Sequence, residues 1–354
     1  MAEKVLMKGN EAIAEAAIIA GCRHYFGYPI TPQTEIAAYM AKKMPKIGGT
    51  FLQAESEIAA INMVYGASSA GKRVMTSSSS PGISLKAEGI SYIAGADLPA
   101  VIVNAQRGGP GLGGIQPSQS DYFQATRGGG HGDYHLIVLT PASVQEMAEL
   151  TVKAFDLADK YRMPVMILAD GTIGQMMEPV SFEFEVGEAP EKPWATTGTK
   201  MQRPHNIVNS LYLKPDQLER TNFERFEKYE QIKKDEALYE EYMTEDADIV
   251  IAAFGIAARV SKNAVNAARA EGIKVGLIRP ITVWPFPEAP FKKVAKSAKQ
   301  IICVELNMGQ MIEDVKLATE GQVPVTLCNR VGGMIPSPNE VLEAIREAAK
   351  GGNN

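Results

Sequence analysis

The sequence has few cysteines for its length. Its 354 residues include three, Cys22, Cys303 and Cys328, and no two of them have C-x-x-C spacing. A disulfide framework is therefore excluded, and a reducing compartment such as the cytoplasm is expected. Iron–sulfur clusters normally take four thiolates, so we expect any cluster to belong to another subunit.

The sequence also lacks an excess of positive charge and a long apolar run. Lys and Arg number 36 against 41 Asp and Glu, for a net charge of -5, which offers no field to attract nucleic acid. No apolar run reaches the roughly 18 residues of a membrane span, and residues 1–8 do not resemble a secretory signal. We expect a cytoplasmic protein with no nucleic-acid or membrane partner.

The chain shows alternating strand and helix patterns in two blocks. They predict two doubly wound α/β domains, residues 1–180 and 247–354. Residues 181–246 are predicted to be a connector with a long charged helix over 215–242, on which Phe223, Phe226 and Tyr229 form one apolar face. The first domain is predicted to have six strands, at residues 24–28, 49–54, 74–76, 98–105, 135–139 and 163–169. The second is predicted to have at least four, at residues 248–254, 274–278, 300–305 and 323–328.

Three turns of the first domain carry unusual residues where a predicted strand gives way to a predicted helix. They are Tyr28-Pro-Ile-Thr-Pro32, Gln53-Ala-Glu-Ser-Glu57 and Thr76-Ser-Ser-Ser-Ser-Pro-Gly82. Open α/β sheets bind their ligands at such turns, so a site is predicted here. A fourth strand delivers Arg107 to the same edge.

The same turns also have simple structural interpretations. Thr31 is expected to cap a helix that starts at Pro32, and Asn10 to cap a helix over 11–20. Glu55 and Glu57 are expected in the first turn of a helix over 55–69, where the helix dipole favours carboxylates. Ser80 is expected to cap a helix reaching residue 94, with the other serines either solvated or lining a site.

Three glycine-rich segments resemble nucleotide-binding or metal-binding loops only in part. Residues 66–73 nearly match G-x-x-x-x-G-K-[ST], but they end a predicted helix, which favours a helix terminus with basic residues. Residues 109–114 match G-x-G-x-x-G without a following helix, which favours a mobile or partner-facing loop. His131 and Asp133, in residues 128–133, have no third ligand at metal-site spacing, and no metal site is predicted.

Taken together, these motifs resemble the alpha subunit of the 2-oxoacid:ferredoxin oxidoreductases, within the thiamine diphosphate-dependent pyruvate:ferredoxin oxidoreductase superfamily. Besides the three turns and Arg107, the resemblance includes Gly129-Gly-His-Gly-Asp133, Val304-Glu-Leu-Asn-Met-Gly-Gln310 and Arg279-Pro-Ile-Thr-Val-Trp-Pro-Phe. It covers nearly the whole chain. The nearest group acts on branched-chain 2-oxoacids or on 2-oxoglutarate.

The resemblance implies an oxidoreductase of anaerobic metabolism that is active only with its beta subunit. The reaction is the CoA-dependent oxidative decarboxylation of 3-methyl-2-oxobutanoate or 2-oxoglutarate to acyl-CoA and CO2, with electrons passed to ferredoxin. Residues 1–180 are then the pyrimidine-binding domain for thiamine diphosphate, and residues 247–354 resemble the transketolase C-terminal domain. The beta subunit would hold the diphosphate, Mg²⁺ and a [4Fe–4S] cluster, and gamma and ferredoxin-like delta subunits would complete the complex.

The resemblance also assigns roles to individual residues. Glu57 is the expected catalytic residue, placed against N1′ of the aminopyrimidine, and Tyr28 and Pro29 join it in binding the cofactor. Thr31 and Arg107 are expected to bind the substrate carboxylate, since a guanidinium matches a carboxylate in geometry and charge. Without the resemblance, Thr31 is a helix cap and Arg107 belongs to a surface ion pair.

Two other functions remain open on the sequence. The chain could be a noncatalytic scaffold subunit, or a nucleotide-binding α/β protein that uses one of its glycine-rich segments. The choice of 2-oxoacid also stays open, because 2-oxoglutarate requires a second cation, for which Lys86, Arg127 and His131 are candidates.

Overall fold

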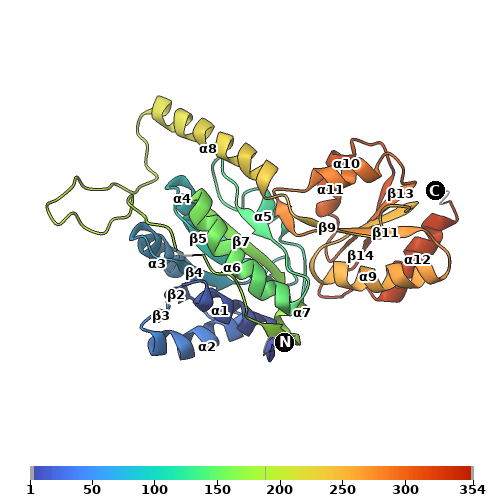
Figure 1. Cartoon of the computed structure of the whole chain (residues 1–354), viewed down its shortest axis with the longest axis horizontal. Coiled ribbons are helices and arrows are strands. Elements are labelled where there is room, and N and C mark those ends of the chain that lie inside the picture. The colour runs from blue at the N-terminus through green and yellow to red at the C-terminus, as the bar shows by residue number, and fades with distance from the viewer. Residues whose placement is uncertain (1–3, 188, 352–354) are drawn as a thin grey trace.

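The computed structural model describes residues 4–187 and 189–351. Figure 1 shows an α/β domain formed by the first half of the chain beside a second formed by its last third, with one long helix lying along them. A cluster of buried apolar side chains extends through both domains. The predicted fold class, two doubly wound α/β domains, is confirmed.

The first domain is built on a sheet with the strand order β12-β6-β7-β5-β4-β2-β3. The strands from β2 to β7 are parallel to their neighbours and correspond to the six strands that the sequence predicts. They are β2 (His24–Gly27), β3 (Thr50–Gln53), β4 (Val74–Ser78), β5 (Ala100–Gln106), β6 (Ile137–Leu139) and β7 (Pro164–Asp170). Because they are parallel, their carboxyl ends share one edge of the sheet.

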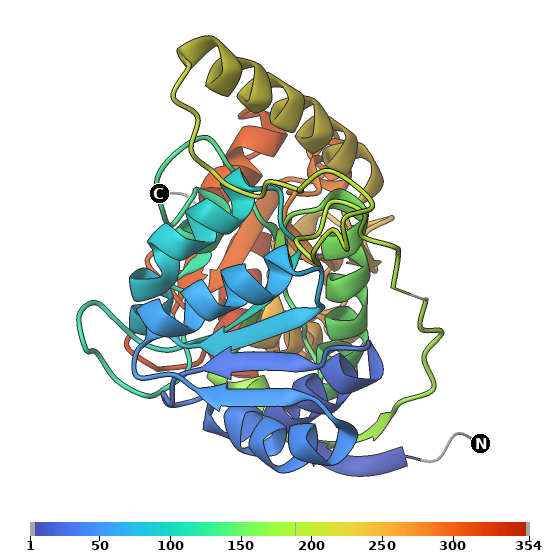
Figure 2. The same cartoon turned by 90° about the vertical axis from the view of Figure 1, so that its left-hand side faces the viewer.

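Helices cover both faces of this sheet, as Figure 2 shows. Right-handed crossovers place α2 and α6 on one face and α3 and α4 on the other, and α1 packs on α2 and α6. The helices are α1 (Gly9–Ile19), α2 (Thr34–Lys43), the 3₁₀ helix η1 (Met44–Ile47), α3 (Glu57–Ser69), α4 (Ser80–Gly95), α5 (Tyr122–Thr126), α6 (Val144–Tyr161) and α7 (Gly171–Gln175).

The predicted cap of the first helix is wrong. Lys8 is the N-cap of α1, and Asn10 lies inside the helix with a buried side chain. The Asn10 amide instead donates to the Pro32 carbonyl at 2.8 Å and to Glu35 at 2.9 Å. Asn10 therefore anchors the turn that follows β2, a long-range contact that overrides its preference for a cap.

The connector begins after a small antiparallel pair, β1 (Lys4–Lys8) with β8 (Met177–Ser181). The chain then extends away from the domain as a loop before α8 (Pro215–Asp235), which lies along the upper side in Figure 1. The helix is shorter than expected, and its apolar face is shifted, because Tyr229 is buried with Ile232 while Phe223 is 67% exposed.

The second domain has a sheet with the order β14-β13-β10-β11-β9. Four of its strands are the parallel strands that the sequence predicts, and β9 adds antiparallel to β11 from within residues 181–246. The strands are β9 (Tyr239–Tyr242), β10 (Ile249–Ala252), β11 (Val275–Pro280), β13 (Gln300–Glu305) and β14 (Val325–Asn329), and the helices are α9 (Gly255–Ala270), α10 (Glu288–Val294), α11 (Met311–Thr319) and α12 (Pro338–Ala349).

The two domains are joined by a strand and by buried polar groups. Strand β12 (Thr282–Trp284) leaves the second domain to pair antiparallel with β6 of the first. The buried Gln119 amide donates to the Phe254 carbonyl at 2.8 Å, and Asn307 donates to the Gln119 carbonyl at 2.8 Å. These contacts hold the second domain against the carboxyl edge of the first sheet.

Among the helices within the described ranges, none is both long and apolar enough to cross a membrane.

Candidate active site

The candidate site lies at the carboxyl edge of the first sheet, where four neighbouring strands deliver the predicted residues. Residues 28–32 follow β2, Glu57 follows β3, the serines follow β4, and Arg107 follows β5. The topology therefore brings together segments that are up to 80 residues apart in sequence.

The turn after β2 is held by Gln33. Its side chain is fully buried, donates to the Tyr28 carbonyl at 3.2 Å and accepts a hydrogen bond from the Ser77 hydroxyl at 2.5 Å. Tyr28, Pro29 and Thr31 are exposed. The turn thus presents its outer residues from a fixed backbone.

The expectation that Thr31 caps a helix at Pro32 is wrong. The backbone N–H of Gln33 bonds to the Ile30 carbonyl, so the chain completes a tight turn first and α2 begins at Thr34. Gln33 occupies the N-cap position, without a side-chain capping bond. Thr31 is left exposed, and its carbonyl accepts a hydrogen bond from Arg107 Nη1 at 3.0 Å.

Glu55 and Glu57 differ in their surroundings. The Ser56 hydroxyl caps α3 by accepting the Ala59 N–H at 3.1 Å, so the helix starts two residues later than expected. Glu57 is its first residue and is 6% exposed, whereas Glu55 lies outside the helix and is exposed. Of the two carboxylates, Glu57 is therefore the one held inside the fold.

Glu57 packs against the first turn of α4. A Cβ atom at Gly82 would lie 2.8 Å from Glu57 Oε1 and 3.1 Å from its Cγ, and it would also collide with the Ser78 hydroxyl. Only glycine leaves room for this approach. One turn farther along α4, Lys86 is fully buried, and burial lowers its pKa to about 7 against the opposing attraction of Glu57.

The four serines, which run from the end of β4 into α4, are buried, so the alternative in which they are solvated is wrong. Ser79 is the N-cap of α4, and Ser80 lies inside the helix instead of capping it. The Ser77 hydroxyl bonds to Tyr25 at 2.6 Å, and the Ser80 hydroxyl donates to Asp121 at 2.6 Å. The Ser78 and Ser79 hydroxyls have no hydrogen-bond partner among the described residues.

Arg107 is buried and does not form the surface ion pair that its residue type alone suggests. Its Nη1 donates to the Thr31 carbonyl, its Nη2 donates to the Leu112 carbonyl at 3.2 Å, and its Nε has no partner among the described residues. Among the described residues no carboxylate is hydrogen-bonded to this guanidinium, although its charge acts on the nearby Asp121 carboxyl. The guanidinium links the Thr31 turn to the glycine-rich loop and keeps one donor unused.

Asp121 is a component of the edge that sequence reasoning missed. Its Oδ2 accepts hydrogen bonds from Ser80 and from the Asn104 amide at 2.9 Å. Burial raises its pKa, while the two hydrogen bonds and the charge of Arg107 act in the opposite direction. No motif surrounds Asp121, so no sequence signal could have identified it. Gln33 directly follows the turn at residues 28–32, and that motif is the signal that could have identified it.

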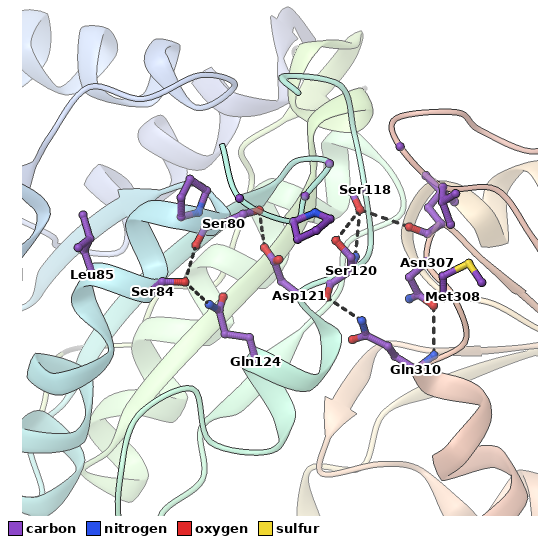
Figure 3. Close-up of a pocket in the computed structure, with 18 residues that line it drawn as sticks. Ser80, Ser84, Leu85, Ser118, Ser120, Asp121, Gln124, Asn307, Met308 and Gln310 are labelled. Carbon is purple, nitrogen blue, oxygen red and sulfur yellow. Dashed lines mark hydrogen bonds between the residues drawn. The ribbon is translucent and has the colours of Figure 1, made fainter. Parts of the chain in front are cut away.

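Two cavities open around this edge. The first, of about 710 Å³, lies between the domains and is lined by Ser80 and Asp121 together with Asn307 and Gln310 of the second domain (Figure 3). The second, of about 690 Å³, is lined by Thr31 and by residues 115–117.

Two sets of contacts bring the predicted residues together, one direct and one indirect. Thr31 and Arg107 are in direct contact. Glu57 joins them through the first turn of α4, because Gly82 adjoins Glu57 while the Ser80 hydroxyl accepts the Arg107 N–H at 3.0 Å. Of the three, Thr31 lines one of the two cavities, and Glu57 and Arg107 line neither.

The glycine-rich segments do not form nucleotide loops. Residues 66–71 end α3, as expected, and Arg73 is buried in an ion pair with Asp159 at 2.8 Å. No helix follows residues 109–114 until α5. Within residues 4–187 and 189–351, no group of three or more His, Cys, Asp or Glu side chains is arranged to hold a metal ion.

The candidate cations for a second substrate carboxylate are placed elsewhere. Lys86 donates to Thr76 Oγ1 inside the fold, and Arg127 forms ion pairs with Glu313 at 3.0 Å and Asp314 at 3.1 Å. His131 lies edge-on to Tyr92 in the second glycine-rich loop. None of the three lines either cavity at the carboxyl edge.

Two family models match the chain. One, described as pyruvate flavodoxin/ferredoxin oxidoreductase, thiamine diphosphate-binding, matches residues 15–260, and the other, pyruvate:ferredoxin oxidoreductase core domain II, matches residues 247–341. The ketoisovalerate oxidoreductase subunit VorB of Methanothermobacter marburgensis is 53% identical over 99% of both chains. The 2-oxoglutarate synthase subunit KorA of the same organism is 38% identical over 98% of this chain and 99% of that protein.

Solved structures are similar as well. The 2-oxoglutarate:ferredoxin oxidoreductase from Magnetococcus marinus, solved with 2-oxoglutarate, coenzyme A and succinyl-CoA bound, superimposes with a TM-score of 0.85 at 30% identity. The match covers 98% of this chain and 65% of that one. A split-gene transketolase, an inactive beta4 tetramer, has a TM-score of 0.61 at 15% identity over 99% of both chains and shows a shared fold.

Proposed function

The chain belongs to the pyruvate flavodoxin/ferredoxin oxidoreductase family, as a 2-oxoacid:ferredoxin oxidoreductase subunit, and we propose that it supplies the pyrimidine side of a thiamine diphosphate site. In this proposal it is the alpha subunit of an enzyme that converts 3-methyl-2-oxobutanoate and CoA to acyl-CoA and CO2, with electrons passed to ferredoxin. The observation that carries the proposal is the convergence of Glu57, Thr31 and Arg107 at one sheet edge around the first turn of α4.

The residues around Glu57 fit an aminopyrimidine ring. Glu57 is 6% exposed, so protein surrounds most of its carboxylate, and glycine at position 82 lets that carboxylate lie directly against the first turn of α4. The buried Ser78 hydroxyl, which lacks a partner among the described residues, is an available hydrogen-bonding group beside them. Tyr28 and Pro29 lie exposed at the same edge.

Thiamine diphosphate, when bound, supplies the carbon nucleophile that attacks the 2-oxo group. Glu57 holds a proton at N1′ of the pyrimidine, which favours the tautomer whose 4′-nitrogen acts as a base. A carboxylate inside the fold suits this role, because the surrounding protein excludes water that would otherwise compete for the proton.

Arg107 and Thr31 hold the substrate carboxylate in this proposal. The unused Nε–H of Arg107 is available to an anion, because no carboxylate among the described residues is hydrogen-bonded to its guanidinium. The Arg107 contact with the Thr31 carbonyl places the Thr31 side chain beside that charge. Thr31 then supplies a hydroxyl donor.

Two observations favour a branched-chain substrate over 2-oxoglutarate. The identity to a ketoisovalerate oxidoreductase subunit, 53%, exceeds the 38% identity to a 2-oxoglutarate synthase subunit. The side chains that could neutralise a second substrate carboxylate are also engaged elsewhere, Lys86 with Thr76 and Arg127 with two acidic residues.

The proposal includes a partner chain. Cys22 and Cys303 are buried on separate domains and Cys328 is half-buried, so the three thiols are not gathered at one site. We assign the diphosphate, Mg²⁺ and a [4Fe–4S] cluster to a beta subunit, and we include gamma and ferredoxin-like delta subunits in the complex. CoA is the co-substrate.

The test is a glutamate exchange in the reconstituted complex. Glu57→Gln removes the ionisable carboxylate and is expected to lower kcat with 3-methyl-2-oxobutanoate at least about 100-fold, the usual scale of acid/base catalysis. Glu55→Gln, two residues away and exposed, is the matched control and should retain activity. Near wild-type decarboxylation by Glu57→Gln would instead favour a noncatalytic scaffold subunit.

The substrate is tested with a panel of 2-oxoacids, CoA and a viologen acceptor. We expect the highest kcat/KM with 3-methyl-2-oxobutanoate. A higher value with 2-oxoglutarate would reject the branched-chain assignment and leave the role of Glu57 untouched.

A further inference from the structure

We propose that Lys86 is a positioning residue for Glu57, a buried ammonium group that serves as the countercharge to the Glu57 carboxylate beneath the pyrimidine ring. This inference rests on the proposed function of Glu57. It concerns a residue that does not itself face the cofactor or the substrate.

The geometry places both side chains along one face of α4. Glu57 comes from the start of α3 and lies against Gly82, and Lys86 follows Gly82 by four residues, which is one helical turn on the same face. Lys86 is 0% exposed, so its ammonium group has no access to water. Its Nζ donates to Thr76 Oγ1 at 2.6 Å and to the Ser77 carbonyl at 3.5 Å.

The partners on β4 satisfy hydrogen bonds but carry no negative charge. A buried ammonium group is costly unless a carboxylate compensates it, and Glu57 of α3 is the acidic residue whose field raises the pKa of Lys86 against the effect of burial. Tyr25 of β2 reaches the Ser77 hydroxyl, and burial raises its pKa well above the ordinary range, so it stays neutral. Asp121 is engaged by Ser80 and Asn104 at the start of α4.

This arrangement has a consequence for the cofactor site. A pyrimidine ring bound at Glu57 would remove the remaining water from its carboxylate, and a charge in such a place is stable only beside a charge of opposite sign. Lys86 supplies that positive charge from within the fold. Because the pKa of Lys86 is lowered to about 7, the countercharge is lost when the pH rises above neutrality.

The first measurement is the titration of Lys86 in the chain itself, without cofactor. NMR of the full chain with ¹³C-labelled lysine, with the Lys86 signal assigned by its loss in Lys86→Met, follows the side chain through pH. We expect a midpoint near pH 7 in the wild type, and a midpoint lower by about half a pH unit or more in Glu57→Gln, since the neutral amide no longer stabilises the ammonium group. An unchanged midpoint in Glu57→Gln would overturn the inference.

The second measurement is the pH dependence of kcat in the reconstituted complex. Lys86→Met keeps an unbranched side chain and removes the charge, and misplacing Glu57 is expected to lower kcat about 10- to 100-fold. The kcat of the wild type should fall with rising pH as Lys86 deprotonates, and the kcat of Lys86→Met should show no such fall. Lys72→Met, which removes an exposed lysine, is the matched control.

The results separate this inference from the proposed function. If Glu57→Gln leaves the Lys86 midpoint unchanged but inactivates the complex, Lys86 is rejected as the countercharge and Glu57 is retained as catalytic. A Lys86 titration that responds to Glu57→Gln, in a complex that stays active, rejects the catalytic role. If Lys86→Met does not fold, Lys86→Arg, which keeps the positive charge, serves to assign the signal, and the titrations of the wild type and Glu57→Gln then decide.

Discussion

The two α/β domains differ in how the turns at the carboxyl ends of their strands are hydrogen-bonded. In the second domain, the turns at the carboxyl ends of the strands are closed by acidic side chains of the protein itself. Glu305 accepts the N–H groups of Gln310, Met311 and Ile312 at the start of α11, and Asp170 of the first domain accepts the N–H of Ile256 at the start of α9. The donors of these helix ends are therefore already used.

The first domain leaves some of the corresponding groups open, although Ser56 and Asp170 cap its helices α3 and α7. The Ser78 and Ser79 hydroxyls and the Arg107 Nε–H are buried without a partner in the described part of the chain. Buried polar groups without partners are costly, and a ligand that completes them removes that cost. A doubly wound sheet offers such an edge in each domain, and we propose that the edge of the second domain serves stability while the open part of the first domain's edge serves binding.

The largest predicted effect tests the closed edge. Glu305→Gln replaces an acceptor oxygen by an amide that faces backbone N–H groups, and we expect the second domain to lose about 3 kcal/mol of unfolding free energy. Chemical denaturation of the full chain measures it. Glu313→Gln is the control, because Glu313 is exposed on α11, the helix whose first N–H groups bond to Glu305. This variant should change the unfolding free energy by less than about 0.5 kcal/mol.

The next effect concerns Asp170, which caps α7 as well as α9. Burial raises its pKa to about 6, above the ordinary value near 3.8, so its contribution to stability is full below pH 4 and is lost as pH rises through 6. We expect the unfolding free energy of the wild type minus that of Asp170→Asn to fall by about 2 to 3 kcal/mol from pH 4 to pH 7. A difference that is constant with pH would contradict the assignment.

The open edge is tested through substrate binding. Arg107→Met removes the guanidinium charge while keeping an unbranched side chain, and we expect the KM for the 2-oxoacid to rise about 10- to 100-fold in the complex. Arg127→Met removes an arginine that already has carboxylate partners and should leave KM within about twofold. If Arg107→Met and Arg127→Met raised KM equally, the charge of Arg107 would have no special role in substrate binding.

The smallest effect is expected at Ser78. Its hydroxyl has no partner in the described chain, so Ser78→Ala should change the unfolding free energy by less than about 0.5 kcal/mol, in contrast with Glu305→Gln. The affinity of the complex for thiamine diphosphate should fall instead. A stability loss as large as that of Glu305→Gln would mean that the two edges are alike.

Sequence patterns predicted the fold because its strands have a local signature. The apolar runs of β5 and β7 are buried parallel strands, and continuous apolar runs are what such strands require. The errors lie at helix starts. Three residues that favour helix caps, Asn10, Thr31 and Ser80, do not cap the expected helices. Asn10 donates to the Pro32 carbonyl and Ser80 donates to Asp121, while Thr31 is an exposed turn residue whose carbonyl accepts from Arg107.

The candidate site was predictable only where a motif marked it. Tyr28 to Pro32, Glu57 and Arg107 were found through their resemblance to a family, and the structure brings them to one edge. Gln33 and Asp121 were not found, because their hydrogen bonds join segments from different βα units. The same reason applies to the proposed pairing of Lys86 with Glu57.

The sequence by itself determined the two α/β domains, the order of their strands along the chain, and the residue types at the carboxyl edge. These features depend on hydrophobic periodicity and motifs, which involve only residues close together in the chain. The tertiary structure alone decided which of those side chains are buried and which keep unused donors. Glu57 and Glu55 are two residues apart and carry the same group, yet only Glu57 is buried and packs against Gly82. Burial and partner choice depend on how distant elements pack, and no local pattern encodes them.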